Sequence, residues 1–375
     1  MPRRSATMLA ATLLLIALLC VSVLMKVPYT EMSPGPTYNT LGDQGGKPVI
    51  TITGHDSYPT TGHLNMTTVQ VTGARYEPSL VNAVIGWLRD DVLVVPHDNV
   101  YPKGQTDADA KKQNAEEFAS SEDSARTAAL KQLGVPVGSE LIVKSVTAGA
   151  PAEGRLHAGD QIVAVDGAAV TSVDQVVAAV TKHKPGESAV FTVVPRVKDA
   201  AGGPAAAAQP AAPGARTDVT VPTVKVRDLD PKAPAERADL AAVGIGTGIR
   251  HTYPFQIDIG LQDVGGPSAG LMFSLGIIDK LTPGGDITGG KFVAGTGTID
   301  DDGKVGPIGG IAMKIIAARG AGAEYFLTPS SNCAEAAKNV PSGLTLVRTD
   351  TLDGALKSLE QIRSGQASAL PSCAK

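Results

Sequence analysis

An uninterrupted apolar run near the amino terminus constrains this chain more than any other feature. Residues 8–25 contain no charged side chain, and only Thr12 and Ser22 are polar. The run is just long enough to cross the hydrocarbon core of a bilayer as one helix. Because Arg3 and Arg4 precede it, the positive-inside rule places its start in the cytoplasm. We therefore predict a single-pass anchor in the cell membrane, with the C-terminal domains extracytoplasmic.

A cleaved signal peptide is the alternative to an anchor. No Ala-x-Ala cleavage site follows the apolar run. Leu18-Leu19-Cys20 also lacks the small residue that precedes a lipoprotein cysteine. These two observations favour an uncleaved anchor.

Two glycine-containing segments place a serine and a lysine in unusual settings. In Gly265-Gly266-Pro267-Ser268-Ala269-Gly270, the serine stands at the start of a helix predicted to run to Lys280, because proline suits a first helical turn and apolar residues follow at helical spacing. Backbone N–H groups at Gly266, the Pro267 region and Ser268 are candidates for an oxyanion hole.

The second segment, Pro307-Ile308-Gly309-Gly310-Ile311-Ala312-Met313-Lys314, places the lysine inside an apolar helix predicted over Ile311–Arg319. Its neighbours on the helix surface cannot neutralise an ammonium group. Burial would therefore lower the pKa of Lys314 and free its amine to act as a general base.

A Gly-x-Ser-x-Gly pentapeptide also occurs in Ser-His-Asp hydrolases, in which the histidine follows the serine. All six histidines of this chain precede Ser268. The reverse order, with His251 and either Asp258 or Asp263, crowds the triad into about one strand and turn, whereas triad members come from separate elements. A dyad of Ser268 and Lys314 fits the sequence better.

Residues 228–362 resemble the proteolytic domain of the Lon family. The residues that carry the resemblance are Gly266-Pro267-Ser268-Ala269-Gly270, Thr296-Gly297, and Pro307-Ile308-Gly309-Gly310 with Lys314 four residues later. The resemblance implies that Ser268 is the nucleophile, that Lys314 is the base and that Thr296 helps to hold the lysine. One departure is Gly265, where many Lon proteases have an acidic residue. Lon-type domains commonly form rings, so a homo-oligomer, as a hexamer, is a further expectation from the resemblance.

Residues 135–227 resemble a PDZ domain of the kind found in bacterial proteases. The resemblance is carried by the predicted strand Glu140–Val146, by Gly159-Asp160-Gln161-Ile162 with Asp166-Gly167 after it, and by a predicted helix over Ser172–Lys182. It implies binding of an extended peptide by strand addition. We place the peptide-binding loop at Val137, Gly138, Ser139, Glu140 and Leu141. A small β-rich spacer is the alternative.

The remaining segments carry no recognisable chemistry. Residues 28–134 contain a turn-rich Ser33-Pro34-Gly35-Pro36 and then two predicted strands, Val49–Thr53 and Asn65–Val71. We expect these strands to pack on the proteolytic domain, which would make the PDZ domain an insertion. Residues 199–215 are a low-complexity loop, either a hairpin tip or a linker, and residues 363–375 are expected to form a disordered tail.

Several other activities lack support in the sequence. Gly285 to Lys291 has the spacing of a phosphate-binding loop, but Phe292 stands where a hydroxyl residue would hold magnesium. The acidic turn Asp300–Asp302 lacks the spaced ligands of a calcium loop, and the net charge of −4 gives no basic footprint for nucleic acid. Cys20, Cys333 and Cys373 show neither metal-ligand spacing nor a disulfide framework, although a Cys333–Cys373 bridge stays open. No cofactor, metal, nucleotide or nucleic-acid partner is predicted.

We therefore expect an α+β multidomain protein with an N-terminal transmembrane helix, a β-rich PDZ domain and a Lon-type α+β proteolytic domain. Its expected function is that of a membrane-anchored, ATP-independent serine endopeptidase that hydrolyses unfolded or flexible proteins with help from the PDZ domain. The alternative is a membrane-tethered PDZ scaffold for peptides, whose proteolytic domain is inactive or processes only itself.

Overall fold

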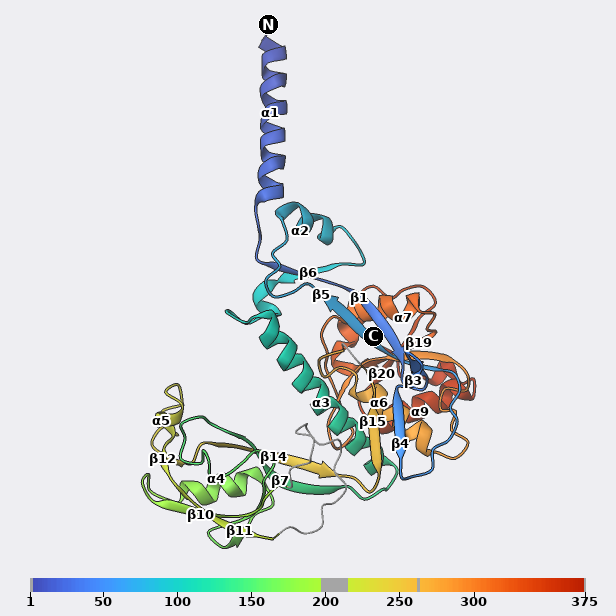
Figure 1. The fold of residues 1–375 in the computed structure, drawn as a ribbon. Helices are drawn as coiled ribbons and strands as arrows, with labels where there is room; N and C mark the ends of the chain where they lie inside the picture. Colours follow the sequence, from blue (N-terminus) through green and yellow to red (C-terminus); the bar gives the residue numbers. More distant parts are fainter. Residues whose placement is uncertain (1–2, 197–214, 262–263, 374–375) are drawn as a thin grey trace. The chain divides into compact units, whose positions relative to one another are not determined.

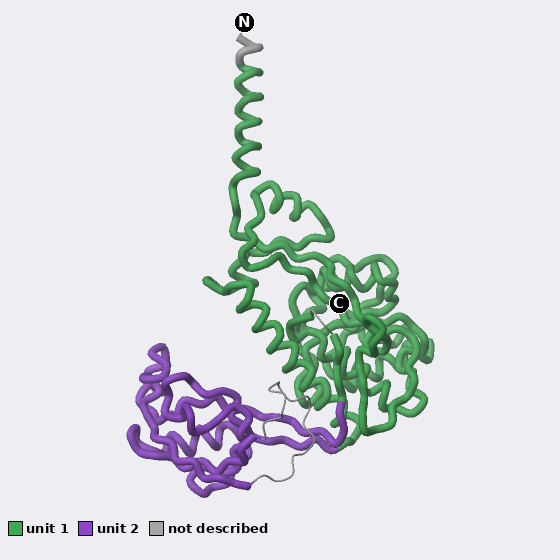
Figure 2. The backbone as a smooth tube through the Cα atoms, viewed as in Figure 1, with its two compact units in different colours: residues 1–135, 257–375 green, residues 136–256 purple. Residues whose placement is uncertain are grey.

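The structure is a computed structural model that describes residues 3–196, 215–261 and 264–373. The chain divides into two compact units (Figure 2): unit 1 combines residues 1–135 with residues 257–375, and unit 2 comprises residues 136–256. The low-complexity residues 199–214 lie outside the described part of the chain.

Unit 1 is built around a six-stranded sheet to which both ends of the chain contribute (Figure 1). The strand order is β20 (Thr345–Thr349), β19 (Tyr325–Pro329), β16 (Phe292–Gly295), β5 (His63–Val71), β1 (Tyr29–Asn39) and β6 (Leu93–Pro96). The first four strands run parallel, and β1 and β6 complete the sheet in antiparallel pairings. Because β5 lies directly beside β16, strands far apart in the sequence share one sheet.

Strand β1 corrects one sequence expectation, because Ser33-Pro34-Gly35-Pro36 is the middle of a strand rather than a turn. The pairing with β5 shifts register between Pro34 and Thr37. Such a bulge is where a strand between two neighbours can accept residues without an N–H donor. Thr68 of β5 spans the bulge by donating a hydrogen bond from Oγ1 to the carbonyl of Pro36 (2.7 Å).

Two packed helices form the interior of unit 1. Helix α6 (Gly270–Leu281) is buried along nearly its whole length. It lies against α3 (Asp107–Gln132), which begins with a capping box formed by Thr106 and Asp109. Ring contact between Phe118 and Phe273 joins the two helices. The helix predicted from Ser268 to Lys280 is thus confirmed to within two residues at each end.

The other elements of unit 1 surround this interior or lead into it. They are α1 (Arg3–Leu24), β4 (Ile50–Thr53), α2 (Leu80–Trp87), β15 (Gln256–Ile259), β17 (Thr298–Ile299), β18 (Val305–Gly306), α7 (Ile311–Gly320), α8 (Cys333–Ala336) and α9 (Leu352–Arg363). The predicted lysine helix, Ile311–Arg319, is confirmed as α7. Helix α1 is long and apolar enough to cross a membrane, by length and composition, and a signal sequence would meet the same criteria.

The tail after α9 is ordered through residue 373, contrary to the expectation of disorder. A short 3₁₀ helix (Ala367–Ala369) follows α9. The carbonyl of Pro371 then accepts a hydrogen bond from the Arg348 N–H of β20 (2.8 Å). A disulfide joins Cys373 to Cys333 at the start of α8. The sequence left this bridge open because spacing alone does not bring two cysteines together.

Unit 2 is a second, smaller sheet covered by one helix. Its strand order is β11 (Thr217–Pro222), β10 (Ser188–Val194), β8 (Gln161–Val165), β7 (Gly138–Val146) and β14 (Ile245–Thr252), and α4 (Val173–Thr181) packs against it. The core contains valine, isoleucine and leucine side chains around Phe191. The expected start of the proteolytic segment at residue 228 is corrected, because β14 pairs with β7 along its whole length and residues 228–256 therefore belong to unit 2.

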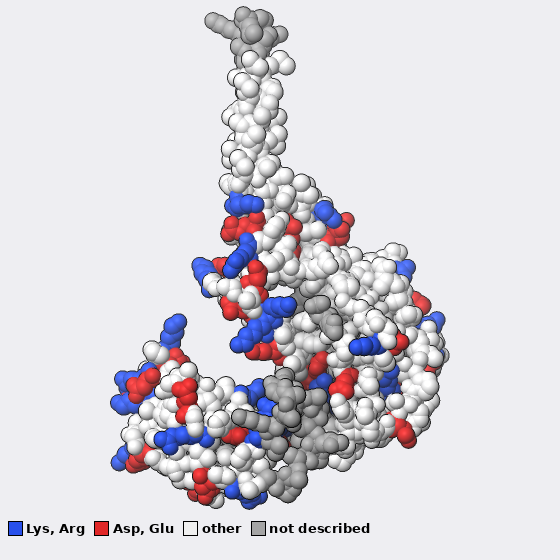
Figure 3. Space-filling model, in the orientation of Figure 1, with Lys and Arg blue, Asp and Glu red and all other residues white. Residues whose placement is uncertain are grey.

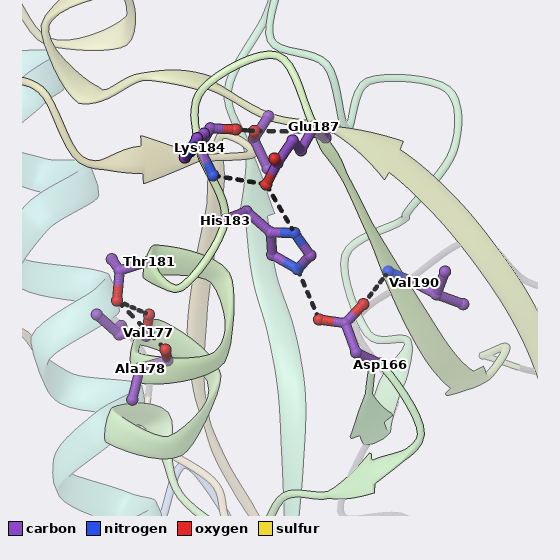
Figure 4. A network of polar contacts seen from close by, with 9 residues as sticks. Asp166, Val177, Ala178, Thr181, His183, Lys184, Glu187 and Val190 are labelled. Carbon is purple, nitrogen blue, oxygen red and sulfur yellow. Dashed lines mark hydrogen bonds and ion pairs between the residues drawn. The ribbon is translucent and has the colours of Figure 1, made fainter.

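A polar network fixes the end of α4 to the sheet (Figure 4). His183, two residues after α4, contacts the Asp166 carboxyl through Nε2 (2.7 Å), and the same carboxyl accepts a hydrogen bond from the Val190 N–H (2.8 Å). Burial opposes the charged form of Asp166, but these two hydrogen bonds outweigh it and lower the pKa of the carboxyl. The network holds α4 to the turn after β8 and to β10.

Candidate active site

Ser268, Thr296 and Lys314 come together at the centre of unit 1. The Lys314 Nζ atom lies 2.6 Å from Ser268 Oγ and 2.9 Å from Thr296 Oγ1. Thr296 in turn donates a hydrogen bond from Oγ1 to the Ser268 carbonyl (3.0 Å). The threonine therefore touches both the lysine amine and the backbone of the serine.

The serine turn is held from two sides. From α3, the Asn114 carbonyl accepts a hydrogen bond from the Gly266 N–H, and Ser121 Oγ donates one to the Pro267 carbonyl (both 2.9 Å). From the opposite side, the Gly297 N–H donates to the Ser268 carbonyl (2.9 Å). These bonds fix the backbone on which the serine hydroxyl is carried.

Gly265 has no room for a side chain in this arrangement. A Cβ atom built there would approach the Asn114 Cβ to 2.8 Å. The departure from the acidic residue of many Lon proteases thus has a local cause, because α3 lies directly against the turn.

Lys314 is carried into the site by a helix that begins with a left-handed residue. Gly310, the residue before α7, has φ +69°, a conformation that favours glycine. Any Cβ atom there would also meet Val69 of β5 at 2.9 Å. The lysine side chain is 2% exposed, and burial lowers its pKa to about 7. A buried amine of this pKa is present in substantial neutral fraction at neutral pH.

Asn332, which the sequence analysis did not single out, holds the loop that leads into α7. Its side chain accepts a hydrogen bond from the Ile308 N–H (3.0 Å) and donates one to the Ile308 carbonyl (2.9 Å). The residue itself is 6% exposed. Since 24 residues separate it from Ile308, no local pattern indicated the pairing.

The oxyanion candidates are narrowed by the backbone hydrogen bonds. The Gly266 N–H is already donated to Asn114, and Pro267 has no N–H to offer. Neither Gly266 nor Pro267 can therefore donate an N–H to an oxyanion, and the Ser268 N–H stays a candidate.

A cavity of about 230 Å³ opens onto the serine and the lysine. The wall opposite the serine turn comes from the N-terminal stretch of the chain, and the residues that form it are Pro36, Tyr38, Met66, Thr68, Val69 and Gln70. Because residues 28–134 contain no recognisable catalytic motif, their contribution to the cavity was not predicted. Only the pairing of β5 with β16 brings these residues to the site.

The predicted peptide-binding residues of unit 2 form part of a strand that is paired along one edge. Gly138, Ser139, Glu140 and Leu141 lie in β7, where they pair with β14, and Val137 directly precedes them. An apolar groove of about 220 Å³ lies elsewhere in unit 2, between α4 and the start of β14. Its walls include Val177, Val180 and Ile245, and β14 is the end strand of the sheet.

The residues that were considered for other activities lie in defined elements of the fold. His251 lies in β14 of unit 2, whereas Ser268 lies in unit 1. The acidic turn Asp300–Asp302 connects β17 to β18 in a hairpin. Within residues 3–196, 215–261 and 264–373, no group of three or more His, Cys, Asp or Glu side chains is arranged to hold a metal ion.

Comparison with known proteins identifies both units. Residues 257–361 match the family model of the Lon protease (S16) C-terminal proteolytic domain, and residues 116–199 match that of the PDZ domain. The chain is 40% identical over 95 residues to a Lon protease of Azospirillum brasilense, which covers 24% of this chain and 11% of the relative. It is 36% identical over 101 residues to Lon protease 1 of Herpetosiphon aurantiacus, covering 26% and 12%. The matched segments thus span about a tenth of the length of these relatives.

Two PDZ domains are among the solved structures that align with part of this chain. The PDZ domain of the SdrC-like protein from Listeria monocytogenes aligns with 29% of this chain and 86% of its own length, at 18% identity and a TM-score of 0.20. The corresponding domain from Listeria innocua aligns with 29% and 92%, also at 18% identity and a TM-score of 0.20.

Proposed function

We propose that this chain, which carries a Lon-type proteolytic domain and a PDZ domain, is a membrane-anchored serine endopeptidase with a Ser268–Lys314 dyad that works without ATP. The observation that carries the proposal is the 2.6 Å approach of the Lys314 amine to the Ser268 hydroxyl, with the lysine buried and its pKa lowered to about 7. A serine activated by an adjacent base is the general requirement for this kind of nucleophile.

In the proposed mechanism, neutral Lys314 takes the proton of the Ser268 hydroxyl while Oγ attacks the carbonyl carbon of the scissile peptide bond. The Ser268 N–H is the proposed donor to the oxyanion of the tetrahedral intermediate. When the intermediate collapses, the C–N bond breaks and Lys314 returns the proton to the leaving amine. A water molecule then gives a proton to Lys314 and attacks the acyl-enzyme ester. As the ester C–O bond breaks, Lys314 returns this proton to Ser268 Oγ, and the new carboxyl terminus is released.

Thr296 is the proposed orienting residue for the lysine. Its Oγ1 accepts a hydrogen bond from the Lys314 amine while donating its own proton to the Ser268 carbonyl. One amine hydrogen is thereby directed away from the serine. The lone pair of the neutral amine is then free to face the hydroxyl that it deprotonates.

The proposed substrates are unfolded or flexible proteins. The cavity at the serine is walled by uncharged side chains from β1 and β5. An extended peptide would enter this cavity without an unfolding motor. The groove between α4 and β14 supports the delivery of such a peptide, because an apolar channel beside an end strand is the arrangement that strand addition needs.

Membrane anchoring is supported by α1. Its described side chains present no Lys, Arg, Asp or Glu (Figure 3), and the helix meets the length of a bilayer span. In this proposal α1 stays attached and the two units lie outside the cytoplasm. The disulfide between Cys333 and Cys373 is consistent with an oxidising compartment.

A membrane-tethered peptide-binding scaffold is the second candidate function, and the groove of unit 2 favours it. The two candidate functions predict different results in a direct assay of casein cleavage by the full chain in detergent, without nucleotide. We expect cleavage by the wild type and none above background for Ser268→Ala. Lys314→Arg, which keeps a positive charge but cannot act as a base, should be equally inactive. Cleavage that persists in either variant would contradict the dyad, whereas an inactive wild type that still binds peptides would favour the scaffold.

A further inference from the structure

Helix α2 exposes a continuous apolar face in unit 1. Val84, Ile85, Trp87 and Leu88 are 42%, 49%, 52% and 81% exposed, respectively. Ala83 and Gly86, on the opposite face of the same helix, are buried. Positions three and four residues apart share one side of a helix, so the exposed side chains form a single patch. A soluble surface rarely leaves such a patch uncovered.

The same helix is bonded to the end of the apolar helix α1. The Leu80 N–H, in the first turn of α2, donates a hydrogen bond to the Met25 carbonyl (2.9 Å), and the Val27 N–H donates one to the Pro78 carbonyl (3.0 Å). Lys26 and Ser79 form an isolated β-bridge between the two segments. Figure 1 shows α2 beside the end of α1. The exposed patch is therefore continuous with the candidate membrane span.

The chemistry of α2 suits the boundary between lipid headgroups and acyl chains. No charged residue occurs from Leu80 to Leu88. Charge returns immediately afterwards, where Arg89 and Asp91 form an exposed ion pair (2.8 Å). Trp87 contacts Tyr29 edge to face at a ring-centroid distance of 5.3 Å, and tryptophan and tyrosine are enriched at the interface of membranes. The patch thus has an apolar centre, an aromatic side and a polar rim.

We propose that α2 lies in the interface of a phospholipid bilayer as a second membrane contact, with Val84, Ile85, Trp87 and Leu88 inserted among the acyl chains. The proposal rests on the membrane anchoring by α1. An amphipathic element of this kind binds by burying apolar area at the membrane surface. Two contacts restrict the tilt of unit 1 on the bilayer, which a single flexible tether does not.

Trp87 makes the proposal directly measurable, because it is the one tryptophan of the chain. The full chain is reconstituted into phosphatidylcholine vesicles with and without doxyl-labelled lipid, and tryptophan fluorescence is recorded. We expect strong quenching by the doxyl lipid, a blue-shifted emission maximum relative to the unfolded chain, and several-fold weaker quenching by water-soluble acrylamide. Casein cleavage in the same vesicles provides a separate readout of the proteolytic domain.

A matched control moves the tryptophan to another exposed apolar position. Val340, 40% exposed in the loop after α8, is changed in the double variant Trp87→Phe/Val340→Trp. There we expect quenching by acrylamide and none by the doxyl lipid. Equal behaviour of the two tryptophans would overturn the proposal.

The remaining outcomes also decide the question. If the chain floats with the vesicles but Trp87 is quenched only by acrylamide, α1 is an anchor and α2 is not a membrane contact. Shielding of Trp87 from both quenchers would mean that a protein surface, such as a second copy, covers the patch. A chain that does not float with vesicles at all would refute the anchor and this inference together, while leaving the result for casein cleavage intact.

Discussion

At the scale of single residues, the Thr296 hydroxyl joins the lysine to the serine backbone. Replacing it by valine keeps the shape of the side chain but removes one acceptor for the Lys314 amine and one donor to the Ser268 carbonyl. Because the site is buried, each unmet partner carries a cost. We expect Thr296→Val to lower kcat by roughly ten- to a hundredfold.

The control for this substitution is Thr296→Ser, which restores the hydroxyl and removes only a methyl group. It should recover most of the activity, measured as kcat on a fluorogenic peptide. A valine variant as active as the wild type would mean that Lys314 needs no orienting partner. Equal losses in the two variants would point to packing rather than to hydrogen bonding.

At the scale of elements, Asn332 ties the loop before α7 to the loop before α8. Asn332→Ala removes both hydrogen bonds to the Ile308 backbone and leaves a partly buried N–H and carbonyl without these partners. Because that loop sets the start of the helix that carries Lys314, we expect kcat to fall roughly tenfold or more. KM should change much less.

Ser331→Ala is the matched control, since Ser331 is exposed in the same 3₁₀ turn. It should leave kcat and Tm unchanged. If Asn332→Ala lowers Tm but not kcat, the asparagine stabilises the fold without positioning the lysine.

The disulfide acts on the neighbouring elements by holding the tail against α8. It closes a loop across a sequence separation of 40 residues, for which restriction of the unfolded chain is worth about 4 kcal/mol at most. We expect Cys373→Ser to lower Tm by roughly 5–15 °C, measured by thermal unfolding monitored by circular dichroism.

Cys20→Ser provides the comparison, because Cys20 is a free and exposed cysteine of α1. It should leave Tm unchanged. Reduction by dithiothreitol should lower the Tm of the wild type to that of Cys373→Ser and should not affect the latter further. A Tm that is indifferent to both changes would show that the tail contributes little to stability.

At the scale of the whole molecule, local sequence patterns predicted where helices and strands lie better than they predicted which of these elements pack together. The apolar periodicity of α6 and α7 and the motif residues Ser268, Thr296 and Lys314 could be read from short segments. The three side chains meet because β16, α6 and α7 belong to one compact unit. The Lys314 amine lies there within hydrogen-bonding distance of both the Ser268 and the Thr296 hydroxyl groups.

Long-range pairings account for what the sequence did not predict. The cavity wall from β1 and β5, the role of Asn332 and the disulfide each depend on residues far apart in the chain. The pairing of the predicted peptide-binding residues 138–141 with strand β14, which starts at Ile245, is likewise a long-range contact. Prolines in Ser33-Pro34-Gly35-Pro36 indicated a turn, and only the bulge against β5 shows how a strand accommodates them.

The most direct test of the account is the pH dependence of kcat/KM for a fluorogenic peptide. Burial lowers the pKa of Lys314 to about 7. In the proposed dyad the neutral amine is the active form, so activity should be low in acid, rise through about pH 7 and level off above it. A lysine with its ordinary pKa would instead require strongly alkaline conditions. A rise near neutral pH would support the buried neutral base. A flat profile, or activity that increases as the pH falls, would contradict the proposal that Lys314 activates Ser268.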